Sequence, residues 1–283
     1  MPHILIANCS PAAMEAQVTI LGVASNAALF ERALHLHDPA VVCSSINIAD
    51  GDALPAGSTF DSFDGIMFTG SPLHILDHTP EVMRQIEFAR AAFASSVPVW
   101  GSCWGLQLAT VALGGSVRRN PKGREIGIAR GITVTEAGRF HPLLVGRATV
   151  FDALCSHLDE IEMPPSGADV LAGNDVSAVQ AMAIRTPGNG LFFGVQYHPE
   201  ITLPVVAALL QLRASRLVSE GFGRSEADLR ALAEDYRALA AGPIRRDLAW
   251  RYGIGDEILN SHQHTMEIGN WLRAAVHPRR RRA

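Results

Sequence analysis

Short apolar segments alternate with amphipathic segments along the first part of the chain. The apolar segments have the length and composition of buried strands, and they are predicted at residues 3–7, 41–48, 63–69 and 97–100. The amphipathic segments predict helices at residues 26–36, 79–95 and 104–113. Because strands alternate with helices, we predict an α/β fold in which helices cover both faces of a mostly parallel central sheet.

The pattern changes after residue 115. Short β-like segments separated by Gly, Pro and Asn turns indicate an antiparallel extension of the sheet, and they lie at residues 132–135, 148–151 and 181–184. An apolar strand at 191–196 and an apolar helix at 204–217 follow. The segments 220–241 and 244–273 are charged and helical in pattern, so we predict an α/β domain over residues 1–212 and a helical C-terminal extension over residues 213–283. We expect the arginines at 279–282 to form a disordered basic tail.

Composition and charge narrow the classes of protein that remain. Apolar residues make up 48% and charged residues 18% of the 283 residues, which excludes a disordered chain. The formal net charge of −4 argues against a general nucleic-acid binder. No apolar run reaches the roughly 18–20 residues that span a bilayer, and the first residues lack the basic and apolar regions of a secretory signal. We therefore expect a cytoplasmic protein without membrane or nucleic-acid partners.

The four cysteines show no CxxC pairing, so in a reducing compartment each is either a packing residue or a reactive thiol. Cys103 differs from the others because it lies in Gly-Ser-Cys-Trp-Gly, directly after a predicted strand and at the start of a predicted helix. This is the arrangement of a nucleophile elbow, in which a tight turn lifts one side chain clear of the sheet. The helix N-terminus favours the thiolate, and the N–H of Trp104 points towards a developing oxyanion.

A thiol nucleophile needs a base, and His198 is the best placed of the eleven histidines. It follows the predicted strand at 191–196, at the sheet edge where ligands bind in such folds. Glu200 lies two residues further and points the same way in an extended chain, so it can orient the imidazole. His262 and His264 suggest a metal pair, but positions i and i+2 of a helix do not share a face, so we expect no metal site.

Several motifs together resemble those of the class I (triad-type) glutamine amidotransferases. Gly-Ser-Cys-Trp-Gly-Leu-Gln at 101–107 and Gln-Tyr-His-Pro-Glu at 196–200 resemble the signature pair of this family. Residues 69–72 resemble its oxyanion strand, and residues 120–127 and 156–160 resemble segments of its GMP-synthase-like branch. The resemblance covers about residues 40–210 and implies a flavodoxin-like α/β fold of the class I glutamine amidotransferase type.

The resemblance also implies a role for each matching residue. Cys103 would attack the side-chain amide carbon of glutamine to form a γ-glutamyl thioester, with His198 as acid and base and Glu200 orienting it. The backbone N–H groups of Gly70 and Trp104 would stabilise the oxyanion. Gln107, Ser156 and His157 would contact the substrate. No cofactor is implied.

Alternatives remain open at this point. The chain is either a free-standing hydrolase of glutamine or of a γ-glutamyl amide, or a glutaminase subunit that delivers ammonia to a separate synthetase. A catalytically idle binding or regulatory module on the same fold is a further interpretation, although an intact Cys103, His198 and Glu200 argue against it. A thiol peptidase or chaperone of related architecture is disfavoured by Gln107 and the His-Pro-Glu segment. The C-terminal extension could cover the site, form a homodimer contact or dock a partner.

Overall fold

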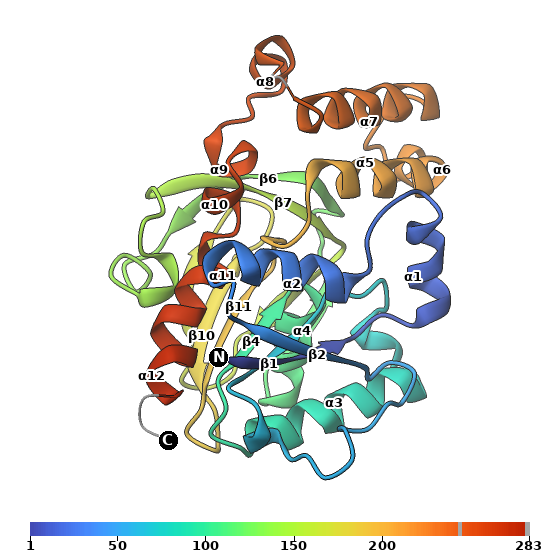
Figure 1. Cartoon of the computed structure of the whole chain (residues 1–283). Helices are drawn as coiled ribbons and strands as arrows, with labels where there is room; N and C mark the ends of the chain where they lie inside the picture. Colours follow the sequence, from blue (N-terminus) through green and yellow to red (C-terminus); the bar gives the residue numbers. More distant parts are fainter. Residues whose placement is uncertain (243–244, 281–283) are drawn as a thin grey trace.

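The computed structural model describes residues 1–242 and 245–280, so Arg281 and Arg282 of the predicted basic tail lie outside the described residues. A nine-stranded sheet runs through the centre of the molecule in the order β2-β1-β3-β4-β11-β10-β9-β6-β7 (Figure 1). Its parallel half consists of β1 (His3–Asn8), β2 (Val42–Asn47), β3 (Gly65–Phe68), β4 (Val99–Ser102) and β11 (Leu191–Val195). Its antiparallel half consists of β10 (Ala181–Arg185), β9 (Asp169–Gly173), β6 (Glu125–Val134) and β7 (Val150–His157). The predicted mostly parallel sheet with an antiparallel extension is confirmed.

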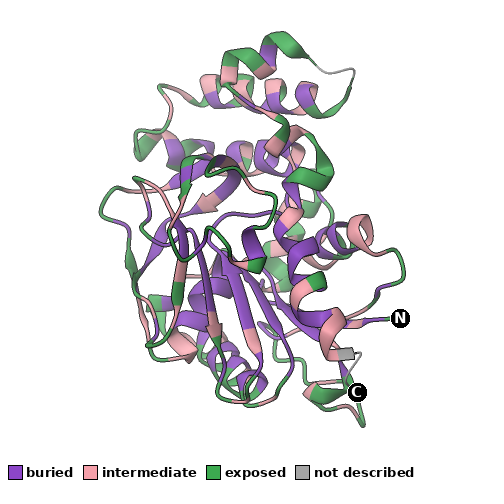
Figure 2. Cartoon of the chain, turned by 90° about the vertical axis from the view of Figure 1, so that its left-hand side faces the viewer, coloured by how far each residue is buried: buried purple, intermediate pink, exposed green. Residues whose placement is uncertain are grey.

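Helices cover both faces of the parallel half. Alternate residues of each strand point to opposite faces, so each strand contributes side chains to both layers. Leu5 and Ile66 pack on one face with α3 (Pro80–Phe93) and α4 (Trp104–Ala112). Ile4 and Met67 pack on the other face with α2 (Asn26–His37), α11 (Met266–Trp271) and the π-helical turn η4 (Leu272–Val276). Figure 2 shows the buried strands between these layers. The second face is therefore covered by segments from near the two ends of the chain.

A third apolar cluster joins the antiparallel half to the helices that follow β11. It contains Ile126 and Leu154 of the sheet together with buried residues of α5 (Leu203–Leu212), α6 (Ala214–Ser219) and α7 (Glu226–Ala240). The chain then continues through α8 (Arg246–Tyr252), α9 (Asp256–Leu259) and α10 (Ser261–His264) before α11, and α12 (His277–Arg280) is the last element of the described residues. The division into two parts at residue 212 stays a prediction. In the described part of the chain, no helix has the length and apolar character needed to cross a bilayer.

Three local differences from the sequence-based predictions have physical reasons. The strand predicted at 97–100 runs instead from Val99 to Ser102, because Gly101 and Ser102 pair with β11. The helix predicted at 204–217 is broken at Arg213, whose ψ of 12° separates α5 from α6. The helix α1 (Ala12–Thr19) has no buried residue, so it lacks the apolar stripe that would have predicted it. The short sheet formed by β5 (Ser116–Arg119) and β8 (Asp159–Met163) was also not predicted.

Candidate active site

Cys103 occupies a sharp turn between β4 and α4. Its φ of 50° and ψ of −100° are unusual for a residue other than glycine, and such values are found where the surrounding structure holds a side chain in a special position. The two flanking glycines make the turn possible. A Cβ at Gly101 would lie 2.6 Å from the backbone of Gly105, and a Cβ at Gly105 would lie 2.5 Å from the backbone oxygen of Phe68. The predicted tight turn between a strand and a helix is present, and close packing requires glycine at both positions.

His198 lies in the loop after β11. The strand β11 itself pairs directly with β4. The Nδ1 of His198 is 2.6 Å from Oε1 of Glu200, and both side chains are buried. Ser102 donates from its hydroxyl to the other carboxylate oxygen of Glu200 at 2.9 Å, and it accepts at 2.9 Å from the indole N–H of Trp100. Trp100 and Ser102 therefore fix the orientation of Glu200, which in turn orients the ring of His198. Ser102 was not predicted as a site residue.

The charge state of His198 follows from its neighbours. Burial lowers the pKa of a histidine, but interactions with Glu200 and Cys103 outweigh burial and raise the pKa of His198 to about 10. The imidazolium form is thus favoured at neutral pH. Burial raises the pKa of Cys9 and Cys43 to about 12 and that of Cys155 well above its usual value. Those three cysteines remain thiols, as expected of packing residues.

Gly70 lies next to the ring of His198, and Trp104 directly follows Cys103. Gly70 follows β3, the other parallel neighbour of β4, and a Cβ there would lie 2.8 Å from Cε1 of His198. Trp104 is the first residue of α4, and its indole N–H donates to Oε1 of Gln85 on α3 at 2.8 Å, which anchors the start of the helix. The structure therefore brings both predicted oxyanion residues to the carboxyl ends of adjacent strands.

A polar cavity of about 140 Å³ opens beside Cys103. Its lining includes Gln107, Ser156 and His157, together with Ser71, Pro72, Leu73, His74, Leu158, Asp159 and three arginines. Gln107 donates to the backbone oxygen of Asp159 at 3.1 Å and to the side-chain oxygen of Gln196 at 3.2 Å. The sulfur of Cys103 lies 3.9 Å from the backbone oxygen of Ser156. The three residues predicted to contact substrate all border this cavity, which we call the polar cavity.

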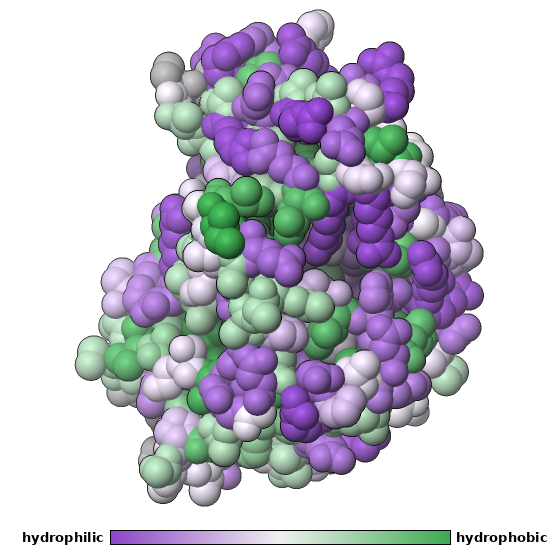
Figure 3. All heavy atoms as spheres, turned by 90° about the vertical axis from the view of Figure 1, so that its right-hand side faces the viewer, coloured by the Kyte–Doolittle hydropathy of each residue, from purple (hydrophilic) through white to green (hydrophobic). Residues whose placement is uncertain are grey.

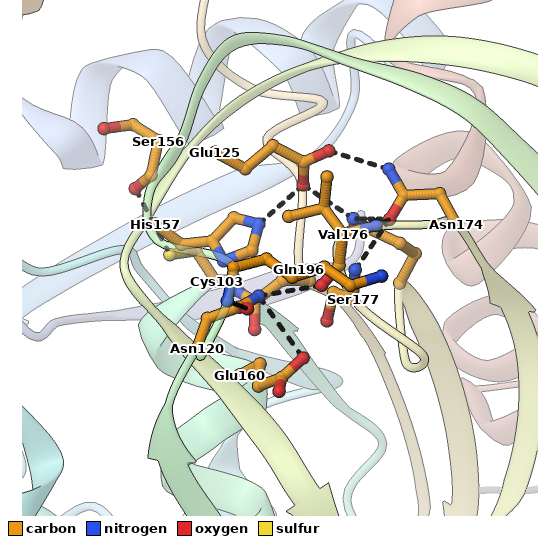
Figure 4. A network of polar contacts seen from close by, with 12 residues as sticks. Cys103, Asn120, Glu125, Ser156, His157, Glu160, Asn174, Val176, Ser177 and Gln196 are labelled. Atoms are coloured by element: carbon orange, nitrogen blue, oxygen red, sulfur yellow. Dashed lines mark hydrogen bonds and ion pairs between the residues drawn. The ribbon is translucent and has the colours of Figure 1, made fainter. Parts of the chain in front are cut away.

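A network of polar contacts holds the ring of His157 (Figure 4). Its Nε2 lies 2.8 Å from Oε2 of Glu125, and its Nδ1 lies 3.0 Å from the backbone oxygen of Asp159. Asn174 and Gln180 donate to the same buried carboxylate. Burial raises the pKa of Glu125, but these hydrogen bonds outweigh burial and lower the pKa overall. Both ring nitrogens of His157 are thus engaged by the protein.

The sequence is similar to those of known proteins. The sequence model of the family described as Glutamine amidotransferase class-I matches residues 36–210. This chain belongs to the class I glutamine amidotransferase family. It is 37% identical to a gamma-glutamyl-L-1-hydroxyisopropylamide hydrolase of a Pseudomonas species, over 81% of this chain and 77% of that protein. It is 32% identical to a glutamine-hydrolysing GMP synthase subunit of Sulfolobus acidocaldarius, over 49% of this chain and 68% of that protein.

The fold is also that of solved amidotransferases. A glutamine amidotransferase from Methylobacillus flagellatus superimposes with a TM-score of 0.65 at 21% identity, covering 97% of this chain and 95% of that chain. All the predicted site residues lie inside the matched range 36–210. The first 35 residues and those after 210, which include segments that cover the second face of the sheet, lie outside this matched range.

Arg213 is a site residue that sequence reasoning missed. It lines the polar cavity, and one guanidinium nitrogen donates to the hydroxyl of Ser156 at 2.9 Å. Burial and the neighbouring Arg124 lower its pKa to about 10, so it still carries a positive charge at neutral pH. Arg124 and Arg216, which also line the cavity, both donate to Glu220. No sequence motif marks Arg213, which lies between α5 and α6.

The two histidines that suggested a metal pair are used otherwise. The ring Nε2 of His264 lies 2.5 Å from the backbone oxygen of Ile201, one residue after Glu200, and the ring of His262 stacks edge-on against His37. Within residues 1–242 and 245–280, no cluster of three or more His, Cys, Asp or Glu side chains could hold a metal ion.

Proposed function

We propose that this amidotransferase hydrolyses the side-chain amide of glutamine or of a γ-glutamyl amide through a thioester on Cys103. The observation that carries the proposal is the arrangement of Cys103, His198 and Glu200. They lie at the carboxyl ends of the paired strands β4 and β11, with the ring of His198 oriented by Glu200 and interacting with Cys103. This combination supplies a nucleophile, an acid and base, and an orienting group at one point.

The first half of the reaction forms the thioester. The thiolate of Cys103 attacks the γ-carbonyl carbon, and the backbone N–H groups of Gly70 and Trp104 are proposed to stabilise the oxyanion. As the tetrahedral intermediate collapses, the C–N bond breaks and the imidazolium of His198 gives its proton to the leaving nitrogen. The raised pKa of His198 suits this step, because the ring holds a proton at neutral pH.

The second half releases glutamate. Neutral His198 removes a proton from water, and the resulting hydroxide attacks the thioester carbon. The C–S bond then breaks, which regenerates the thiolate of Cys103 and the imidazolium of His198. Glu200 stabilises the imidazolium in both halves from its position 2.6 Å from Nδ1.

The glutamyl group is proposed to occupy the polar cavity. Its α-carboxylate would pair with Arg213, because Arg124 and Arg216 are already engaged by Glu220 and the nearest partner of Arg213 is a neutral hydroxyl. Gln107 and the Ser156–His157 segment border the same space. A cavity of about 140 Å³ suits a small polar group rather than a peptide.

A second candidate is a glutaminase that supplies ammonia to a separate synthetase chain. Similarity to the Sulfolobus GMP synthase subunit favours it, but that similarity spans 49% of this chain, against 81% for the γ-glutamyl amide hydrolase. The self-sufficient hydrolase is therefore the better supported of the two.

The test is release of glutamate and of ammonia or amine by the purified chain, with glutamine and a panel of γ-glutamyl amides. We expect turnover by the wild-type chain, loss of at least about 10⁴-fold in Cys103→Ala, and unchanged turnover in Cys43→Ala, a half-buried cysteine on β2. Far-ultraviolet circular dichroism verifies that both variants are folded. Turnover that persists in Cys103→Ala would overturn the mechanism, and turnover that requires an added cell extract would favour the ammonia-supplying glutaminase.

A further inference from the structure

A second and larger cavity, of about 350 Å³, adjoins the polar cavity. The two share lining residues Ser71, Pro72, Ser156 and Arg213, but they divide the catalytic residues between them. Cys103 and Gln107 line the polar cavity, whereas Gly70, His198 and Glu200 line the larger one. A substrate whose glutamyl group occupies the polar cavity therefore directs its leaving nitrogen, which His198 protonates, towards the larger cavity.

Apolar side chains from three parts of the chain line the larger cavity, together with polar residues that include Ser10, Gln17 and Arg213. The apolar side chains come from α1 and the loop after it, from the start of α2, and from α5, and they are Met14, Val18, Val23, Ala24, Leu29, Val205, Leu209 and Leu212. The carboxylate of Glu15, also on the wall, accepts hydrogen bonds from the side chain of Asn8 and the backbone N–H of Asn26. This polar group is thus satisfied within the protein and needs no partner on a ligand. We call this space the apolar cavity.

Ammonia is much too small to fill the apolar cavity. A water molecule, similar in size to ammonia, takes up about 30 Å³ of liquid volume, whereas the apolar cavity measures about 350 Å³, within the usual range of small-molecule sites. Figure 3 looks onto the side of the molecule that carries α1 and α6, where apolar surface borders strongly hydrophilic surface. An apolar group bound there would leave water and contact the side chains of α1 and α5.

We propose that the apolar cavity binds the amine half of the substrate, so that the preferred substrates are γ-glutamyl amides of uncharged alkyl amines rather than glutamine. This inference rests on the proposed function and specifies its leaving group. Much of the cavity wall, residues 10–29, lies outside the range 36–210 matched by the family model. Residues shared with the family thus carry the chemistry, and the N-terminal segment of this chain selects the amine.

The first experiment measures kcat/KM for glutamine and for γ-glutamyl methyl-, propyl- and butylamide. Burial of each added carbon is expected to raise kcat/KM by up to about fourfold, so even partial burial of the four carbons of butylamide should raise it about tenfold above that of glutamine. A kcat/KM that is flat or falls from glutamine to butylamide overturns the inference and leaves the proposed function intact. If none of the four substrates is hydrolysed, both this inference and the proposed function are overturned.

The second experiment fills the cavity. In Val18→Trp, the ratio of kcat/KM for butylamide to that for glutamine should fall by about tenfold or more, because the new ring takes the place of the alkyl chain. The matched control is Ile20→Trp, an 84% exposed position just after α1 that does not line the cavity, and its ratio should equal that of the wild type. Leu209→Phe, at a lining position on α5, makes the same test from a second helix. A ratio unchanged in both cavity variants would overturn the assignment.

Discussion

Glu267 on α11 offers a sharp test of how the C-terminal helices support the active site. Its carboxylate is fully buried and accepts from Nε and Nη2 of Arg147 at 2.6 and 2.7 Å, and from the hydroxyl of Tyr197 at 2.7 Å. Tyr197 directly precedes His198, and His264 contacts the backbone oxygen of Ile201. The segment 264–267 therefore holds the loop that carries His198 and Glu200 at both of its ends.

The substitution Glu267→Gln keeps the shape of the side chain and removes its charge. The guanidinium of Arg147, whose side chain is only 3% exposed, then lacks its counter-ion. Leaving one partner of a buried ion pair uncompensated costs about 3–5 kcal/mol of unfolding free energy. Tyr197→Phe removes one hydrogen bond to a charged group and should cost about 1.5–3 kcal/mol. By contrast, Arg230→Gln breaks the exposed pair with Glu226 on α7 and should cost no more than about 1 kcal/mol.

Two measurements check this prediction. Urea unfolding monitored by tryptophan fluorescence gives the free energies, and steady-state kinetics at low temperature, where the variants stay folded, give kcat and KM. We expect kcat to fall in Glu267→Gln and Tyr197→Phe with KM little changed, because the loop of His198 shifts while the polar cavity keeps its lining. Glu267→Gln with a stability within about 1 kcal/mol of the wild type, or with full kcat, would refute the reasoning.

Three further predictions concern the site itself. The substitution Glu200→Gln removes the negative charge that contributes most to raising the pKa of His198. The alkaline limb of the pH profile of kcat/KM should therefore move from near pH 10 to a pH lower by about one unit or more. An alkaline limb at the same pH as in the wild type would contradict its assignment to His198. In Arg213→Met, the substrate's α-carboxylate loses the guanidinium proposed to bind it. Steady-state assays should show a KM for γ-glutamyl substrates that is raised about tenfold or more, with little effect on kcat. In Gly105→Ala, the new Cβ would lie 2.5 Å from the backbone oxygen of Phe68, so urea unfolding should show a loss of about 1–3 kcal/mol; wild-type stability would show that the elbow tolerates a side chain.

The elements that carry the nucleophile and the base could be predicted because their signals are local. The elbow needs a strand, a cysteine between two glycines and a helix, and these follow one another directly within residues 99–112. The alternation of strands and helices predicted the parallel half of the sheet in the same way. His198 and Glu200 were recognisable because both follow a strong apolar strand.

Other parts of the site depend on contacts between distant positions, which no local pattern records. Ser102 acts on Glu200 from 98 residues away, and Arg213 meets Ser156 across 57 residues. The shape of the apolar cavity depends on α1, a helix whose exposed positions give no amphipathic signal. The buried pairing of Glu267 with Arg147 likewise joins positions 120 residues apart.

The position of β11 in the sheet has a consequence for the newly made protein. β11 lies next to β4, but the chain returns to it only after the whole antiparallel half has been formed from the intervening residues. Since synthesis proceeds from the N-terminus, Cys103 leaves the ribosome well before His198, and the helix that fixes the loop of His198 follows later still. A chain interrupted between Cys103 and α11 thus carries the thiol without all of the contacts that surround it in the complete fold. The contacts of Glu267 and His264 that hold the loop of His198 can therefore form only after α11 has been synthesised.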